Sequence, residues 1–241
     1  SGRHGYTPSA GIDELRAAAA RSMGDLRGLA IEPDEVVIGA GAKPFIGYTI
    51  ASVTDYGAGD EVIYPVPGFP IYESQIVANG AVPVALPLAE ARGFAFDPAA
   101  LEARIGPKSR LLILNTPHNP TGGLLTRADL EAIAAVLRRH PDVWVYADEI
   151  YSKLVYDGEF VSIAALPGMR ERTITVNGFS KGFAMTGWRL GYAAAPEPIA
   201  KAMGRMQSAV SAGANQFVQR AAIAALEGPR ADVERMRLQY Q

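Results

Sequence analysis

The sequence predicts an α/β fold of three layers, in which helices cover both faces of a mostly parallel, seven-stranded sheet. The strongest sign is a set of nearly unbroken apolar runs, such as residues 110–114 and 143–147, because strands buried on both faces read this way. Helical patterns separate most of the strands, as crossovers between parallel strands require. The strands are expected at residues 35–39, 61–64, 82–86, 111–115, 143–148, 173–177 and 190–194.

Two helix starts support this order of elements. Asp97 precedes a proline, which is the usual arrangement of an N-cap followed by proline in the first turn. Thr126 and Asp129 form a capping-box pattern before a helical segment at 130–139. The last part of the chain is helical again, with helices expected over residues 199–206, 215–226 and 231–241.

The composition argues against several classes of function. The chain has 241 residues, and 49% of them are hydrophobic, enough to fill the core of one large domain. Its 23 Lys and Arg residues nearly balance 25 Asp and Glu residues, and no basic block is present, so a nucleic-acid partner is not expected. The absence of cysteine excludes disulfides and thiolate metal sites.

Metal, hydrolase and membrane functions also lack their sequence signs. His4, His118 and His140 have no metal-ligand spacing, so no metal is expected, and no Gly-x-Ser-x-Gly motif is present. Apolar stretches such as residues 81–88 fall short of the roughly 20 residues that cross a bilayer. The N-terminus lacks the pattern of a secretory signal. We expect a soluble, cytoplasmic protein without a membrane partner.

One lysine has an informative context. Residues 177–189 read Asn-Gly-Phe-Ser-Lys-Gly-Phe-Ala-Met-Thr-Gly-Trp-Arg, which places Lys181 after one expected strand and Arg189 before the next. A lysine amine that burial keeps neutral can form a Schiff base with an aldehyde. The apolar stretch between the two cations predicts that both face one interior cavity that holds an anion. The alternative is a solvated loop lysine and a surface arginine, the usual state of either residue.

Asp148 ends the apolar run at 143–147, where an unpaired carboxylate would be costly, so it needs a cationic partner. A pyridinium N–H would serve, and the ion pair would keep the ring nitrogen protonated. Tyr151 could reach the phenolic oxygen of the same ring. The alternative is an N-cap aspartate that starts a helix. The lysine, the carboxylate and the arginine together point to pyridoxal 5′-phosphate as cofactor.

A strand, the small-residue segment 39–43 and an apolar helix follow one another, an arrangement that lets a phosphate approach the free N–H groups of a helix start. Gly41, Ala42 and Lys43 would form this cradle. The segment is a poor dinucleotide fingerprint because the third glycine is missing. A tight turn without a ligand is the alternative.

Two further loops carry candidate residues. A rigid proline turn at 65–72 could present Phe69 as a flat face for an aromatic ring, although a core aromatic is equally compatible with the pattern. Asn119 lies in a loop rich in proline and glycine after a buried strand, at the sheet edge where ligands usually bind. Its amide could donate to a ring oxygen or could satisfy its own loop backbone.

The chain resembles the fold-type I pyridoxal-phosphate aminotransferases, in particular the aspartate aminotransferase-like class I/II group. The motifs that carry the resemblance are Tyr-Thr-Pro-Ser-Ala-Gly-Ile at 6–12, Asn-Pro-Thr-Gly at 119–122, Asp-Glu-Ile-Tyr at 148–151 and Ser-Lys with Met-Thr-Gly-Trp-Arg-Leu-Gly-Tyr between 180 and 192. They extend over nearly the whole chain.

The resemblance implies a role for each candidate residue. Lys181 would form the aldimine with the cofactor and later carry the proton, with Asp148 on the ring nitrogen. Tyr151 and Asn119 would hold the ring hydroxyl, and Phe69 would stack on the ring. The phosphate would lie against Gly41, Ala42, Lys43 and Arg189, while Tyr6 would reach the phosphate of a neighbouring subunit in a homodimer.

The sequence departs from the family pattern at two places. Gly178 stands where many relatives have a phosphate-binding serine, and Ser180 or a backbone N–H would have to compensate. The C-terminal small domain of the family, with the arginine that grips the substrate carboxylate, is also expected to be missing. We therefore expect a cofactor-binding large domain at residues 1–205, followed by helices at 206–241 that lead toward that small domain.

The expected activity is amino transfer between an L-amino acid and a 2-oxo acid. Two alternatives stay open. Lyases, decarboxylases and cyclases related to this family use the same lysine and aspartate, and a chain without the small domain could bind the cofactor without turnover.

Overall fold

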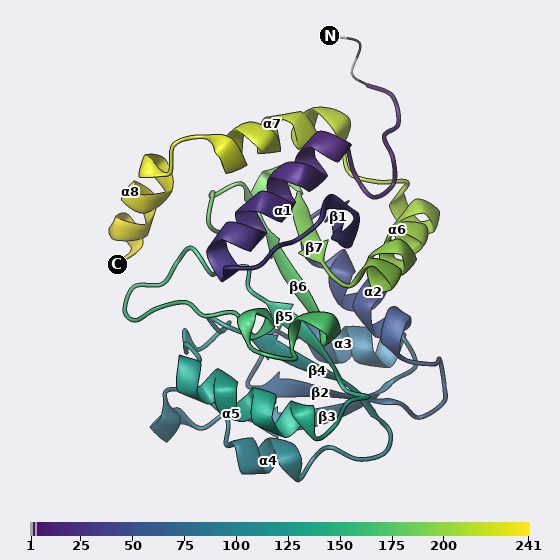
Figure 1. Cartoon of the computed structure of the whole chain (residues 1–241), viewed down its shortest axis with the longest axis vertical. Helices are drawn as coiled ribbons and strands as arrows, with labels where there is room; N and C mark the ends of the chain where they lie inside the picture. The colour runs from purple at the N-terminus through teal and green to yellow at the C-terminus, as the bar shows by residue number, and fades with distance from the viewer. Residues whose placement is uncertain (1, 3) are drawn as a thin grey trace.

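Within residues 2 and 4–241, which the computed structural model describes, the seven expected strands form one sheet. The strand order in the sheet is β1-β7-β6-β5-β4-β2-β3. Within the described residues, β7 is antiparallel to both of its neighbours, and all other strands run in one direction. The predicted mostly parallel sheet is confirmed (Figure 1). The strands are β1 (Val36–Gly39), β2 (Glu61–Val66), β3 (Val82–Pro87), β4 (Ser109–Asn115), β5 (Trp144–Asp148), β6 (Thr173–Gly178) and β7 (Gly191–Ala194).

Helix α1 precedes the first strand, and the other helices lie between and after the strands, as expected. The α-helices are α1 (Asp13–Arg27), α2 (Pro44–Val53), α3 (Ile71–Ala78), α4 (Pro98–Glu102), α5 (Arg127–Arg138), α6 (Glu197–Ser211), α7 (Gln216–Glu227) and α8 (Ala231–Tyr240). Short 3-10 helices are η1 (Pro33–Glu35), η2 (Glu90–Arg92), η3 (Ile163–Ala165), η4 (Arg170–Arg172) and η5 (Thr186–Trp188).

Both predicted helix starts are confirmed. Asp97 caps α4, where its carboxylate accepts a hydrogen bond from the Ala99 N–H at 3.0 Å. Thr126 and Asp129 form a complete capping box at the start of α5, with reciprocal bonds of 3.1 and 2.9 Å. These contacts satisfy backbone donors that the first turn of a helix would otherwise leave free.

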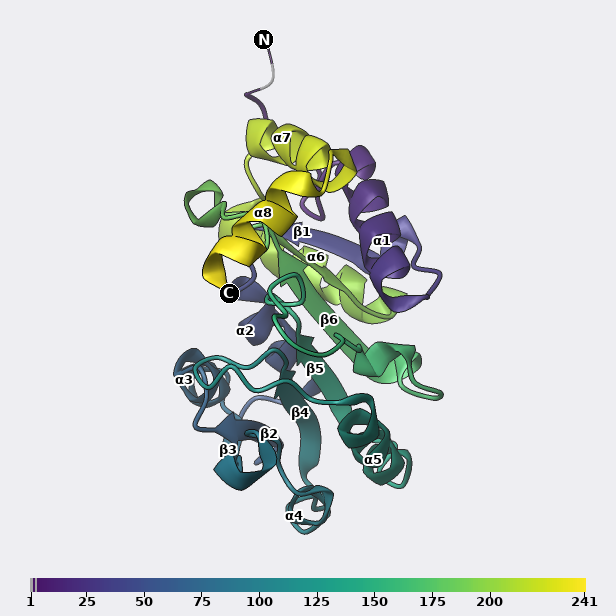
Figure 2. The same cartoon turned by 90° about the vertical axis from the view of Figure 1, so that its left-hand side faces the viewer.

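Alternate residues of the central strands pack on opposite faces of the sheet, which gives the three layers. One face carries α2, α3 and α6 and includes Ile113 and Tyr146. The other face carries α4 and α5 over residues such as Val145, and α1 and α7 over residues such as Ile38. Figure 2 shows α2 and α3 on one side of the strands and α1 and α5 on the other.

The carboxyl ends of β1, β4, β5 and β6 lie at the same edge of the sheet, and the antiparallel β7 begins there. The register places Asn115 beside Asp148, and it places Gly39 and Gly178 on either side of Gly191. Ligands of open α/β sheets bind at this edge, because the loops that follow the strands converge there.

The C-terminal helices continue from the sheet without a break at the expected domain boundary. Residues 205 and 206 both lie inside α6, so the division between 1–205 and 206–241 stays a prediction. Among the helices of the described residues, none combines the length and apolar character that a bilayer span needs.

Candidate functional site

A cavity of about 520 Å³ lies at this sheet edge and collects most of the predicted residues. They come from the starts of α2 and α3, from the last residue of β5, and from the loops that follow β4, β5 and β6. The predicted residues that line it are Ala42, Lys43, Phe69, Asn119, Asp148, Tyr151, Ser180, Lys181 and Arg189.

The other two predicted residues lie outside this lining. Gly41 is directly beside the Arg189 guanidinium. Tyr6 is 94% exposed and belongs to a separate hollow, formed by residues 4–7 and 211–217.

Asp148 is the buried carboxylate of the cavity. Its Oδ2 accepts a hydrogen bond from the Tyr72 hydroxyl at 2.7 Å, and its Oδ1 receives a longer bond of 3.4 Å from the Ile150 N–H. Burial raises the pKa of Asp148 to about 6, against the two hydrogen bonds, which lower it. The alternative of a helix N-cap is wrong, because the residues after β5 form turns and no helix begins at Asp148 in the described chain. Among the described residues, no cation forms an ion pair with this carboxylate.

The raised pKa of Asp148 predicts that its ionised carboxylate destabilises the ligand-free fold. Between its ordinary pKa of 3.8 and about 6, the folded chain holds a proton that the unfolded chain has lost, so stability falls as the pH rises through this window. Asp148→Asn should therefore stabilise the ligand-free chain by about 3 kcal/mol at about pH 8 and by almost nothing below about pH 4.

Urea unfolding of both chains across this pH range measures the effect. Asp25→Asn, which changes an exposed carboxylate of α1, is the control, and its free energy of unfolding should depend on pH as that of the parent chain does. If the free energies of unfolding of the Asp148→Asn chain and the parent changed with pH in the same way, the raised pKa of Asp148 would be contradicted.

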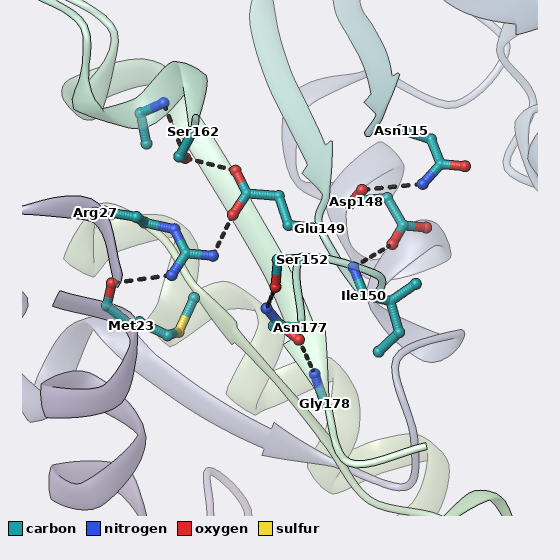
Figure 3. Close-up of polar contacts among 11 residues, drawn as sticks. Met23, Arg27, Asn115, Asp148, Glu149, Ile150, Ser152, Ser162, Asn177 and Gly178 are labelled. Carbon is teal, nitrogen blue, oxygen red and sulfur yellow. Dashed lines mark hydrogen bonds and ion pairs between the residues drawn. The ribbon is translucent and has the colours of Figure 1, made fainter. Parts of the chain in front are cut away.

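The neighbouring Glu149 points away from the cavity, and Figure 3 shows the two carboxylates on opposite sides of the end of β5. Its Oε2 accepts a charged hydrogen bond from Arg27 of α1, and its Oε1 accepts one from the Ser162 hydroxyl. Arg27 also donates to the Met23 carbonyl at 2.9 Å. Burial raises the pKa of Glu149, while Arg27 and Ser162 lower it. The network ties α1 to the residue that directly follows Asp148 at the end of β5.

Three cations, Lys43, Lys181 and Arg189, line the cavity without an ion-pair partner among the described residues. The prediction that Lys181 and Arg189 share a cavity is confirmed. The expectation that the lysine is buried is wrong for the single chain, since both side chains are exposed. The physical reason is that the loop between β6 and β7 forms the open rim of the cavity, and Thr186 and Trp188 of this loop are exposed as well.

The segment after β1 has the shape that the cradle prediction requires. Gly41 has φ of 91°, a conformation that favours glycine, and a Cβ there would overlap the Arg189 guanidinium. Arg189 itself donates to the Thr186 carbonyl at 2.9 Å and keeps its second amino group over Gly41. The close approach of a guanidinium to a glycine turn at a helix start fits an anion such as a phosphate.

Gly178 ends β6 under the same turn. A Cβ at this position would lie 2.9 Å from the Gly191 Cα and 3.1 Å from the Leu190 carbonyl oxygen, so a serine would not fit without a shift of β7. The Gly178 N–H is already bonded to the Asn177 side chain at 2.8 Å (Figure 3). The Gly178 N–H is thus occupied, whereas Ser180, one of the two predicted compensations, lines the cavity.

The side chains of the remaining candidates, Asn119, Phe69 and Tyr151, are available for contact with a ligand. The Asn119 side chain makes no hydrogen bond within residues 2 and 4–241; its backbone N–H donates to Asn115 Oδ1 at 2.8 Å. Phe69 is half-buried, with its ring 5.5 Å from Lys43 Nζ. The Tyr151 ring lies 5.5 Å from Lys181 Nζ. The alternative, in which the Asn119 side chain bonds to the backbone of its own loop, is therefore wrong.

Six of the residues that line this cavity were not predicted from the sequence, and Tyr72, Tyr146 and Asn115 are the three that surround Asp148 with polar side chains. Tyr72 follows Phe69 by one helical turn and packs edge-on against it at 5.8 Å. Tyr146 shares the face of β5 with Asp148, two residues on, and Asn115 ends β4 beside Asp148 in register. The spacing of Tyr146 and the parallel register of Asn115 are signals that could have found both. Nothing in the sequence places Tyr72 against Asp148.

A second cavity, of about 690 Å³, adjoins the first. The two share Asn119, Tyr151, Ser180, Lys181 and Thr186, so Lys181 stands at their border. The second cavity continues over apolar and aromatic residues, including Leu124, Val155 and Tyr156. A ligand in the first cavity would therefore have room beside the lysine for a second molecule.

Comparison with known proteins supports one family. The family model for class I and II aminotransferases matches residues 1–241. Similar curated proteins include the bifunctional aspartate aminotransferase and glutamate/aspartate-prephenate aminotransferase of Petunia hybrida, 45% identical over 222 residues, or 92% of this chain and 46% of that protein. The aspartate/prephenate aminotransferase of Cereibacter sphaeroides is 41% identical over 232 residues, or 95% of this chain and 58% of that protein.

Solved structures agree with these matches. The aspartate aminotransferase of Rhizobium meliloti aligns with a TM-score of 0.96 and 38% identity, covering 100% of this chain and 60% of that one. The aromatic aminotransferase of Pyrococcus horikoshii aligns with a TM-score of 0.95 and 40% identity, covering 99% of this chain and 64% of that one. The chain spans about half the length of the curated relatives it matches. It belongs to the class I and II aminotransferase family, whose members use pyridoxal 5′-phosphate.

Proposed function

We propose that this chain binds pyridoxal 5′-phosphate in the 520 Å³ cavity and provides the lysine for amino transfer between an L-amino acid and a 2-oxo acid. The observation that carries the proposal is the charge of the cavity. Among the described residues, three cations without an ion-pair partner line it, while its one carboxylate, Asp148, is buried and has no cation paired with it. A ligand with an anionic arm and a protonated ring nitrogen would balance both.

The positions of the charges match such a ligand. Asp148 ends β5, whereas Gly41 follows β1 and Arg189 precedes β7, two strands away from β5. Neighbouring strands are about 4.8 Å apart, so the two charged ends of the cavity are separated by roughly 10 Å. A pyridine ring with a phosphate arm is of this size.

Each side chain then has a part in holding the cofactor. Asp148 would accept a hydrogen bond from the ring nitrogen, and Asn119 and Tyr151 would contact the ring oxygen. Phe69 would cover one face of the ring. The phosphate would lie against the Gly41–Lys43 turn, Ser180 and Arg189.

When bound, the cofactor supplies an electron sink for bonds at the substrate α-carbon. The chain supplies the proton transfer, and Lys181 is the group placed for it, because its amine stands at the border between the two cavities. Asp148 would hold the ring nitrogen in its protonated form.

Gly41→Ala tests the phosphate cradle. An added Cβ would both strain φ and displace the Arg189 guanidinium, so we expect cofactor affinity to fall by on the order of tenfold or more. Gly57→Ala is the matched control: Gly57 has φ of 73° but no atom within 4 Å of its would-be Cβ.

Both variants should lose about 1 kcal/mol of stability through backbone strain, and only Gly41→Ala should lose affinity. Calorimetric titration of the ligand-free chains with pyridoxal 5′-phosphate measures this. Equal affinities in the two variants would argue against a phosphate at this turn.

Several features of the whole protein belong to the same proposal. We propose a homodimer in which Tyr6 of one copy approaches the cofactor phosphate of the other; the 94% exposure of Tyr6 supports this. We also propose the division into a cofactor-binding unit at 1–205 and helices at 206–241 that lead toward a small domain, a cytoplasmic location, and amino and 2-oxo acids as substrates.

Product analysis tests the activity. The chain, saturated with cofactor, is incubated with an amino acid and 2-oxoglutarate, and amino transfer predicts equal amounts of glutamate and of the new 2-oxo acid. Release of carbon dioxide or of a side-chain fragment would instead indicate a decarboxylase or lyase. Bound cofactor without any product would indicate a chain that binds but does not turn over.

A further inference from the structure

Two buried phenols flank Asp148, and they differ in one respect. Tyr72 of α3 is fully buried and donates its hydroxyl to Asp148 Oδ2 at 2.7 Å. Tyr146 of β5 is 1% exposed and lies on the same strand face as Asp148, but its hydroxyl has no partner in the part of the chain that the structure describes. Both line the 520 Å³ cavity.

The Tyr72 bond leaves the carboxylate with one preferred orientation. Oδ2 is occupied by the phenol, whereas Oδ1 receives only the 3.4 Å bond from the Ile150 N–H. Oδ1 has the longer and weaker of the two bonds, and it is therefore the oxygen with the greater acceptor capacity left for a ligand in the cavity. The peptide of Asp148 is also held, because the Asn115 side chain donates to its carbonyl at 3.0 Å (Figure 3). The carboxylate cannot turn away without breaking the Tyr72 bond.

We propose that Tyr72 is a positioning residue of the reaction: its hydroxyl fixes Asp148 as an anion with Oδ1 directed at the ring nitrogen of the cofactor. This inference rests on the proposed function. The Tyr72 side chain also packs edge-on against Phe69 at 5.8 Å. It therefore contacts both the residue that would cover the ring face and the carboxylate that would bind the ring nitrogen. Burial next to Asp148 holds the pKa of Tyr72 well above 10, so its hydroxyl stays a donor at every pH of interest.

The charged and titratable groups around Asp148 come from five segments. Tyr72 belongs to α3, Tyr146 to β5, Glu149 and Tyr151 to the turn after β5, Lys43 to the start of α2, and Lys181 and Arg189 to the loop between β6 and β7. Among these groups, Tyr72 alone donates a side-chain hydrogen bond to the carboxylate. A neutral donor at 2.7 Å favours the anion, so its loss makes Asp148 easier to protonate.

The matched pair Tyr72→Phe and Tyr146→Phe tests the proposal, because each removes one buried hydroxyl beside Asp148 and keeps the ring. Affinity for pyridoxal 5′-phosphate is measured against pH by titration of the whole ligand-free chain. Tyr72→Phe should weaken binding at neutral pH by about tenfold and move the acid limb of the profile upward by about one pH unit. Tyr146→Phe should leave the limb in place.

Urea unfolding of the ligand-free chain gives a second readout that needs no cofactor. The pH-dependent change caused by Tyr72→Phe should vanish in an Asp148→Asn background, because the carboxylate through which it acts is gone. A Tyr72→Phe profile that coincides with that of Tyr146→Phe, while Asp148→Asn weakens binding, would overturn the positioning role alone. If Asp148→Asn binds the cofactor as tightly as the parent chain, the proposed function itself fails.

Discussion

Lys181→Ala is expected to abolish the covalent attachment of pyridoxal 5′-phosphate and to reduce amino transfer by on the order of 10³-fold or more. The reason is that the amine at the border of the two cavities would serve twice, first as the partner of the cofactor aldehyde and then as the carrier of the proton. The visible absorbance of the loaded chain and the rate of 2-oxo acid formation measure the two effects.

Lys43→Ala is the matched control, since Lys43 is the other lysine of the first cavity and its amine lies over Phe69, 5.5 Å from the ring centre. This variant should bind the cofactor more weakly yet retain the covalent bond. If the Lys181→Ala chain kept the absorbance and the rate of the parent, another group would carry the chemistry.

Arg27→Met is expected to destabilise the fold by about 3–5 kcal/mol, a large part of the stability of a domain of this size. The side chains of Arg27 and Glu149 are both 1% exposed, so removal of the guanidinium leaves a buried carboxylate whose remaining side-chain partner among the described residues is the Ser162 hydroxyl. Without Arg27 the pKa of Glu149 would rise further, because burial already raises it and the cation opposes this. The loss should therefore be smaller at about pH 5 than at pH 8, since protonation relieves the unpaired charge.

Two further variants complete this test by chemical unfolding. Arg27→Met/Glu149→Gln should recover most of the lost stability, because a neutral amide can still accept from Ser162. Arg21→Met makes the same substitution on the same helix but in an exposed pair with Glu227, and it should change stability little. A loss in Arg21→Met equal to that in Arg27→Met would show that helix α1, and not the buried pair, is responsible.

The fold was predictable because its signals are local. Apolar runs mark the central strands, and the caps at Asp97 and Thr126 mark two helix starts. The cavity was predictable in outline for a related reason: the motifs follow parallel strands, and parallel strands bring their carboxyl ends to one edge. Most predicted residues indeed line a single cavity.

What the sequence could not supply are contacts between distant segments. Arg27 and Glu149 are 122 residues apart, and Tyr72 and Asp148 are 76 apart, with no pattern that links either pair. The sequence does not predict the exposure of Lys181, because the apolar composition of its loop indicates burial, whereas the loop forms the open rim of the cavity. Pairing and exposure of this kind depend on the assembled layers and not on periodicity.

Borohydride reduction of the chain loaded with pyridoxal 5′-phosphate, followed by peptide mapping, tests the central claim most directly. We predict one phosphopyridoxyl group, on Lys181. The strongest competitor is Lys153, because burial lowers its pKa, but this residue does not line either cavity of the described chain. A label on Lys153 or Lys43, or no label in cofactor-saturated protein, would contradict the account.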